Sequence, residues 1–234
     1  MFRIPTAQAR WLIVTFTAWL SIGAEPLHAD ELDDAIAAEE ALQRELNAIN
    51  GGALEFLAGR PAAVHSQRHR IIVTDSSLRD GWVGFEQCHD HLDAVAATEI
   101  VFHPERVRDL VVSSHADIAR IVIDGSRVQL EEVGSAAHIC ITARSRALVA
   151  EGGGRFLLRN GPYMRRFLDG FYPLRLRMEV WWPAAALAFL GAVPQPQPGL
   201  AITTGADHLV LDASFRGRLT TELRFRDLRV SSLP

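Results

Sequence analysis

The densest group of chemically versatile side chains is the sequence Gln87-Cys88-His89-Asp90-His91. A cysteine thiolate with imidazoles is a donor set that copper and zinc sites use. In an extended chain Cys88 projects from the opposite side to His89 and His91, so a site here needs a turn or ligands from a second strand. Two residues that share a strand face can provide them, His138 and Cys140. The candidate copper or zinc ligands are Cys88, His89, His91, His138 and Cys140.

The two cysteines also allow a simpler interpretation. Cys88 and Cys140 are the only cysteines of the chain, and two thiols in a β-rich exported protein usually form one disulfide. A single Cys-His-x-His string lacks the second ligand pair of a zinc signature. We therefore expect a Cys88–Cys140 disulfide and no bound cofactor, with the metal site as the alternative.

The segment Ser113-Ser114-His115-Ala116-Asp117 contains the three residue types of a hydrolase triad. Triad members normally come from distant segments and meet in space, and the chain has no Gly-x-Ser-x-Gly elbow. The segment is therefore interpreted as a strand end running into a polar turn. A hydrolase with a site assembled across strands is the third function class, after a binding protein and a metal-handling protein.

Arginine and aromatic residues are interleaved between Arg155 and Arg177. Such a surface suits an anionic ligand, an acidic partner or lipid headgroups. Arginine stems can equally cover apolar surface at a seam between two domains and pair with Asp169 or Glu179, and this second interpretation is preferred. The candidate anion or partner patch is Arg165, Arg166, Arg175 and Arg177.

The first segment, residues 1–29, has the order of a secretory signal peptide. Arg3 and Arg10 precede an uncharged apolar run from Trp11 to Ala24, and Ala29 stands before acidic Asp30. Signal peptidase reads this order of charge, apolar run and small residue. The run is shorter than the ~20 residues that span a bilayer. We expect cleavage near Ala29, no membrane anchor afterwards, and a periplasmic or secreted protein.

The periodicity of residues 30–60 predicts an amphipathic helix followed by a linker. Leu32, Ile36, Leu42 and Ile49 fall within one broad face at ~100° per residue, and Gly51-Gly52 suits a helix C-terminus.

From about His69 onward, short apolar segments alternate with turn residues roughly every ten residues, which predicts an all-β, mainly antiparallel fold. Gly152-Gly153-Gly154 is the expected boundary between two tandem immunoglobulin-like β-sandwich domains, residues 66–151 and 152–234. One large distorted sandwich is the alternative.

The net charge of −4 argues against a nucleic-acid partner. The leading function is an exported, non-enzymatic binding or assembly-accessory protein that acts through surface recognition. Its expected partner is another exported or membrane protein. The oligomeric state is left open.

Overall fold

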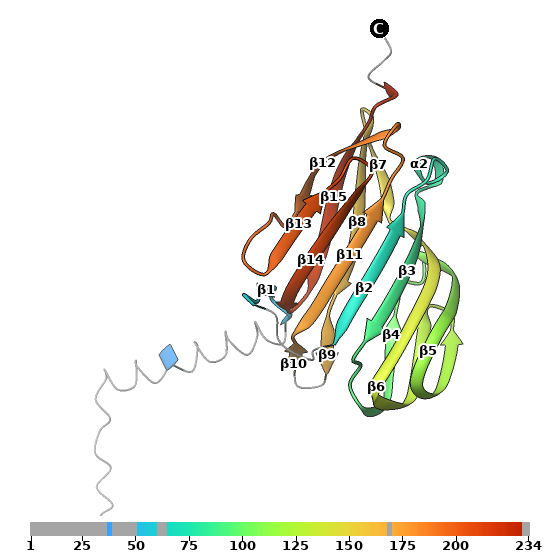
Figure 1. Ribbon diagram of the computed structural model, residues 1–234, viewed down its shortest axis with the longest axis vertical. Helices are drawn as coiled ribbons and strands as arrows, with labels where there is room; N and C mark the ends of the chain where they lie inside the picture. Colours follow the sequence, from blue (N-terminus) through green and yellow to red (C-terminus); the bar gives the residue numbers. More distant parts are fainter. Residues whose placement is uncertain (1–36, 39–50, 60–64, 168–169, 231–234) are drawn as a thin grey trace, which may run out of the picture. The chain divides into compact units, whose positions relative to one another are not determined.

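The computed structural model describes residues 37–38, 51–59, 65–167 and 170–230. Strand dominates these residues (Figure 1), with one short named helix, α2 (Ser77–Asp80). Alternation of side chains explains the strands. In β11 (Leu174–Trp181), Leu176 and Met178 are buried while Arg177 between them is exposed, as a strand with one covered face requires. The predicted all-β class is confirmed.

The larger sheet has nine strands. Seven form one continuous order: β1 (Glu55–Phe56), β14 (His208–Arg216), β11, β2 (Ser66–Ile72), β3 (Trp82–Asp90), β6 (Arg127–Arg146) and β4 (Val95–Val101). Two more strands pair beside this path, β13 (Leu200–Thr204) with β14 and β5 (Val107–Asp124) with β6. The neighbours β2 and β11 run parallel, whereas the other strand pairs of the described residues are antiparallel.

A smaller sheet has four strands in the order β12 (Leu187–Val193), β15 (Leu219–Asp227), β8 (Arg155–Tyr163) and β7 (Leu148–Gly152). The short strands β9 (Arg165–Phe167) and β10 (Gly170–Tyr172) form a separate pair. Met178 and Phe215 of the larger sheet share one core cluster with Leu158 and Phe225 of the smaller sheet. The fold is therefore sandwich-like over this part of the larger sheet.

A second apolar cluster stabilises the β4–β5–β6 part of the larger sheet. It contains Ile100, Ile118, Leu130 and Ile139, all buried. Each of these side chains removes apolar surface from water, which stabilises by about 25 cal/mol per Å² buried. The larger sheet thus carries two separate apolar clusters.

Two tandem domains with a boundary at Gly152 are not confirmed. The larger sheet joins strands from both sides of this residue, because β2 pairs with β11 along its full length, from Ser66 opposite Arg175 to Ile72 opposite Trp181. Gly152, Gly153 and Gly154 lie instead at the turn between the paired strands β7 and β8, and all three have positive φ angles. Glycine adopts this backbone conformation without steric cost. The arrangement is closer to the alternative of one large distorted sandwich.

The predicted signal peptide and almost all of the helix predicted between residues 30 and 50 lie outside the described residues. Within residues 51–59, part of the expected linker, the chain forms strand β1. No helix in the part of the chain that the structure describes is long and apolar enough to cross a membrane.

Candidate ligand-binding site

The site is built on the neighbouring strands β2 and β3, whose covered face changes character along its length. At one end this face carries Ile71 opposite Phe85, and at the other end it carries the pairs His69 with Gln87 and Gln67 with His89. All four polar side chains are buried, with 3–7% of their surface exposed. Burying polar side chains costs free energy unless they find partners, so this polar end needs a structural or functional explanation.

A cleft of about 1280 Å³ opens over this face. Its apolar lining includes Phe85 and Ile71 from the sheet and Val95, Ile100 and Phe102 from β4 and the residue that follows it. The lining also includes residues from the end of β8 and from β9, among them Asn160, Tyr163 and Arg165. Cavities that hold small molecules combine an apolar wall with a few polar groups in this way.

Three of the buried polar side chains form a directed hydrogen-bond chain. Nε2 of Gln87 lies 2.5 Å from Nε2 of His89, and Nδ1 of His89 lies 2.9 Å from Nε2 of His65. Because an amide nitrogen only donates, Gln87 donates to His89. A neutral His89 then carries its hydrogen on Nδ1 and donates to His65. The chain is consistent only with His89 in its neutral form.

Burial keeps His65, His69 and His89, the histidines at the polar end of the cleft, neutral near pH 7. It lowers the pKa of His69 to about 3. Burial, together with the charge of Arg165, lowers the pKa of His65 to about 4. Burial and the neighbouring His65 also hold the pKa of His89 well below its usual value. The polar end of the cleft therefore has no formal positive charge on its histidines.

Arg165 brings a charge to the edge of the cleft, but that charge is paired. Its Nε donates to Oδ2 of Asp93 at 2.9 Å, and a second, short hydrogen bond joins the same two side chains. The guanidinium also lies near the rings of Phe167 and Tyr172. Arg165 thus packs on rings and pairs with an acid, as the structural interpretation expects, but the acid is Asp93 and not Asp169 or Glu179.

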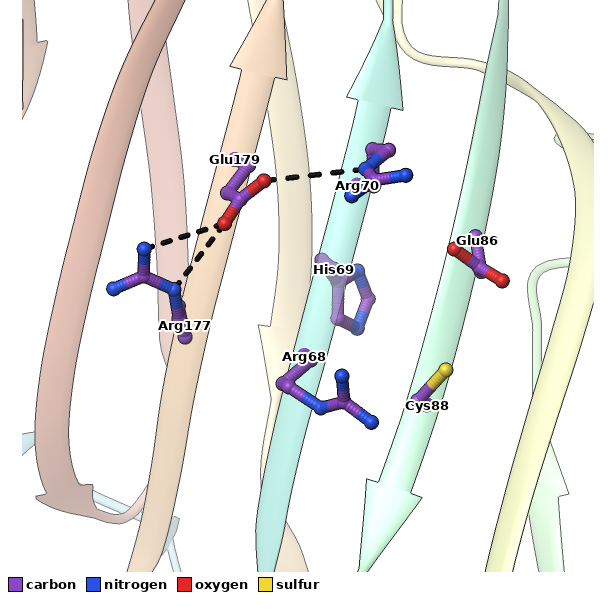
Figure 2. A pocket seen from close by; sticks show the side chains of 7 residues that line it. All are labelled: Arg68, His69, Arg70, Glu86, Cys88, Arg177 and Glu179. Carbon is purple, nitrogen blue, oxygen red and sulfur yellow. Dashed lines mark hydrogen bonds and ion pairs between the residues drawn. The ribbon is translucent and has the colours of Figure 1, made fainter.

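The other arginines of the candidate patch lie elsewhere. Arg166 lines the cleft with its guanidinium near the ring of Phe171. Arg175 and Arg177 lie on the exposed side of β11. Arg177 lines a hollow of about 160 Å³. Figure 2 shows Glu179 between Arg177 and Arg70, with an ion pair to each. The four arginines thus divide between the cleft and the opposite face of the sheet.

Two of the predicted metal ligands are joined to each other. Cys88 and Cys140 are directly opposite on β3 and β6, and their sulfur atoms form a disulfide with a Cα–Cα distance of 4.0 Å. The predicted disulfide is confirmed. Glu86 lies close to both sulfurs, but two sulfurs bonded to each other are not thiolate ligands.

The histidines of the predicted metal set do not meet. His89 points to the covered face, whereas His138 lies on the disulfide side, with Nε2 3.3 Å from the Cys140 sulfur. His91 is exposed, with φ of 56°, just after β3. Alternation along β3 separates Cys88 from His89, as expected from the sequence, and no turn brings them back together.

The disulfide side also holds an arrangement of serine, histidine and aspartate. Nδ1 of His138 lies 2.7 Å from Oδ1 of Asp90, and Nε2 of His138 lies 3.4 Å from Oγ of Ser114. Burial alone would raise the pKa of Asp90, but its hydrogen bonds with His138 and Arg68 outweigh burial and lower it. Ser114 belongs to the serine-containing segment singled out in the sequence. Its two partners come from strands β3 and β6 rather than from that segment.

Sequence reasoning did not select His65, Gln67, His69 or Gln87. A signal was present, because His65, Gln67 and His69 alternate in phase with apolar Ile71, and period-two alternation predicts a shared strand face. Polar residues at alternate positions near the end of a strand are ordinarily assigned to a solvent-exposed face. Only the covering of this face by other strands reveals them as a buried polar group.

Comparisons with known proteins add little to this description. No model of a protein family matches the chain, and no curated protein matches it. Among solved structures, it is similar to a mutant M1 zinc metallopeptidase from Deinococcus radiodurans bound to a Tyr-Ser-Ala substrate, with 12% identity and a TM-score of 0.38. A two-domain M1 zinc metallopeptidase mutant bound to L-tryptophan gives 12% identity and a TM-score of 0.36.

The aligned region covers 73% of this chain in both cases, and 43% and 44% of the two metallopeptidase chains. The chain therefore spans less than half of those proteins. Likeness at this level carries no argument about fold or activity.

Proposed function

We propose that the chain is an exported binding protein, periplasmic or secreted, and that the cleft over β2 and β3 is its ligand site. The observation that carries this proposal is the cleft itself, about 1280 Å³ in volume, with an apolar wall and a buried polar end. Cavities for drug-sized ligands are typically about 300–1,000 Å³, so the volume suits a ligand with a long apolar part. The signal-peptide order of residues 1–29 supports export.

Binding of the fluorescent apolar probe N-phenyl-1-naphthylamine tests the ligand site. The probe should become more fluorescent in the cleft, and the variant Thr98→Trp, which fills the cleft from β4, should weaken binding at least about tenfold, or about 1.4 kcal/mol. Thr98 lines the cleft. Titration of the purified mature protein at fixed probe concentration gives both affinities.

The matched control is Ala97→Trp, one residue away on the same strand, because Ala97 is exposed and, unlike Thr98, does not line the cleft. This variant should bind the probe like the unmodified protein. Absence of any fluorescence increase, or equal weakening by both tryptophans, would contradict the proposal.

A second candidate function is hydrolysis, and the Ser114–His138–Asp90 arrangement favours it. In a serine hydrolase the histidine accepts the serine proton and the aspartate orients the imidazole. Asp90 and His138 have the hydrogen bond that this requires, and Ser114 lies within 3.4 Å of the histidine. The three side chains come from β3, β5 and β6, so the candidate site is assembled across strands.

A fluorophosphonate probe and p-nitrophenyl acetate test the hydrolase candidate. If Ser114 is a nucleophile, the probe labels it, and Ser114→Ala and His138→Ala each reduce ester hydrolysis at least about a hundredfold, as expected when a triad member is removed. Ser113→Ala is the matched control, because Ser113 donates to the carbonyl of Cys140 and not to His138. Unlabelled protein with no esterase activity would eliminate this candidate.

A further inference from the structure

Several buried polar atoms at the cleft have no hydrogen-bond partner among the described residues. They are Oε1 of Gln67, Nε2 of His69 and Nδ2 of Asn160, and all three residues line the cleft. Gln67 and His69 are only 6% and 7% exposed. A buried polar atom without a partner is costly, so a ligand that supplies both a donor and an acceptor here gains more than an apolar one.

The charges around these atoms limit the kind of ligand group that fits. Arg165 is bidentate to Asp93, and the three histidines are neutral because burial lowers their pKa values. A ligand carboxylate or phosphate at this end would lose its hydration against neutral histidines and an arginine that is already paired with Asp93. Burying a charge without a paired partner is strongly unfavourable, whereas an uncharged hydroxyl or amide is satisfied by hydrogen bonds alone.

The hydrogen-bonding roles of the three unpartnered atoms also match an uncharged hydroxyl or amide. Oε1 of Gln67 is only an acceptor and the amide nitrogen of Asn160 is only a donor, while Nε2 of a neutral His69 takes either role according to its tautomer. The ring of His69 is held by an edge contact with Tyr163, with ring centroids 4.9 Å apart. Directly beyond the polar atoms, Ile71 and Phe85 begin the apolar wall.

We propose that the cleft binds an amphipathic ligand with an uncharged head group that both donates and accepts hydrogen bonds, as in an alcohol or a monoglyceride. The head group lies against Gln67 and His69, and the apolar chain lies along Ile71, Phe85 and Phe102. This inference rests on the proposed ligand site and adds the chemical class of its ligand.

Three probes with the same twelve-carbon chain length test the head group: 1-lauroylglycerol, laurate and dodecyltrimethylammonium. Each is titrated, below its critical micelle concentration at pH 7.5, against protein loaded with N-phenyl-1-naphthylamine. The affinity of the uncharged glyceride, measured by displacement of the naphthylamine, should be at least tenfold higher than that of either ion. Tighter binding of laurate or of the ammonium would overturn the inference while leaving the ligand site intact.

The double variant Gln67→Leu/His69→Phe separates head-group recognition from cleft formation. It keeps the side chains at similar size and retains an aromatic ring beside Tyr163. Its affinity for 1-lauroylglycerol, measured relative to its own affinity for N-phenyl-1-naphthylamine, should fall about tenfold. An unchanged relative affinity would overturn the inference. Failure of the naphthylamine to bind the unmodified protein would instead remove the proposed function.

Discussion

Loss of the Cys88–Cys140 disulfide should lower the free energy of unfolding by about 4 kcal/mol. The bond joins residues 52 apart in sequence, and closing a loop of that size removes conformational entropy mainly from the unfolded chain. Urea unfolding of the oxidised protein and of Cys88→Ala/Cys140→Ala, followed by circular dichroism, gives the difference. A loss below about 1 kcal/mol would contradict this expectation, since it lies well outside the loop-closure figure.

The matched control is Glu86→Ala/Thr142→Ala, the neighbouring cross-strand pair on the same two strands and the same face. Surface substitutions of this kind usually change stability by about 0.5 kcal/mol or less. Thiol titration of protein recovered from the periplasm adds a direct test. Two free thiols and one copper or zinc ion per chain would instead favour the metal set of Cys88, His89, His91, His138 and Cys140.

Acidification from pH 7.5 to pH 5 should destabilise the protein by about 2 kcal/mol for each of His65 and His69. Burial lowers the folded-state pKa values of these residues to about 4 and about 3, whereas the unfolded side chains bind protons below about pH 6.5. The unfolded state therefore gains protons first as the pH falls. The stability is fully present above about pH 6.5 and is lost progressively toward the folded pKa values.

Urea unfolding at pH 7.5, 6 and 5 measures this loss. His69→Phe, which retains the ring contact with Tyr163, should reduce the loss at pH 5 by about 2 kcal/mol. His115→Gln is the control, because His115 is exposed on β5 and should leave the pH dependence unchanged. A free energy of unfolding that is the same at pH 7.5 and pH 5 would show that these histidines are not buried in their neutral form.

Local sequence patterns were sufficient to predict the strands and the disulfide. In an alternating strand, Cys88 lies on the opposite face to Phe85, and Cys140 lies on the opposite face to its two isoleucine neighbours. The structure places the two cysteines directly opposite each other on paired strands. Successive side chains of a strand point to opposite faces, so the sequence of each segment by itself shows which residues share a face. Phase alone allowed the sulfurs to meet, and the register of β3 with β6 brought them together.

The domain organisation was not predictable in the same way. The pairing of β2 with β11 joins segments about a hundred residues apart through backbone hydrogen bonds, and backbone groups are the same for nearly every residue type. No local sequence pattern therefore predicts that β2 pairs with β11. A glycine run that suits a flexible linker also suits the turn between β7 and β8, since both need backbone conformations that glycine accepts.

By itself, the sequence determined the all-β class and the strand faces, because these depend on side-chain alternation, and its two thiols favoured a disulfide over a metal site. Tertiary structure alone decided which side of each strand is covered. It brought Asp90, Ser114 and His138 together from three strands, and it buried His65, Gln67 and His69 beneath strands distant in sequence. Burial converts those polar residues from an ordinary solvated strand end into neutral, partly unpartnered groups, because their environment, and not their identity, sets their pKa values and hydrogen bonds.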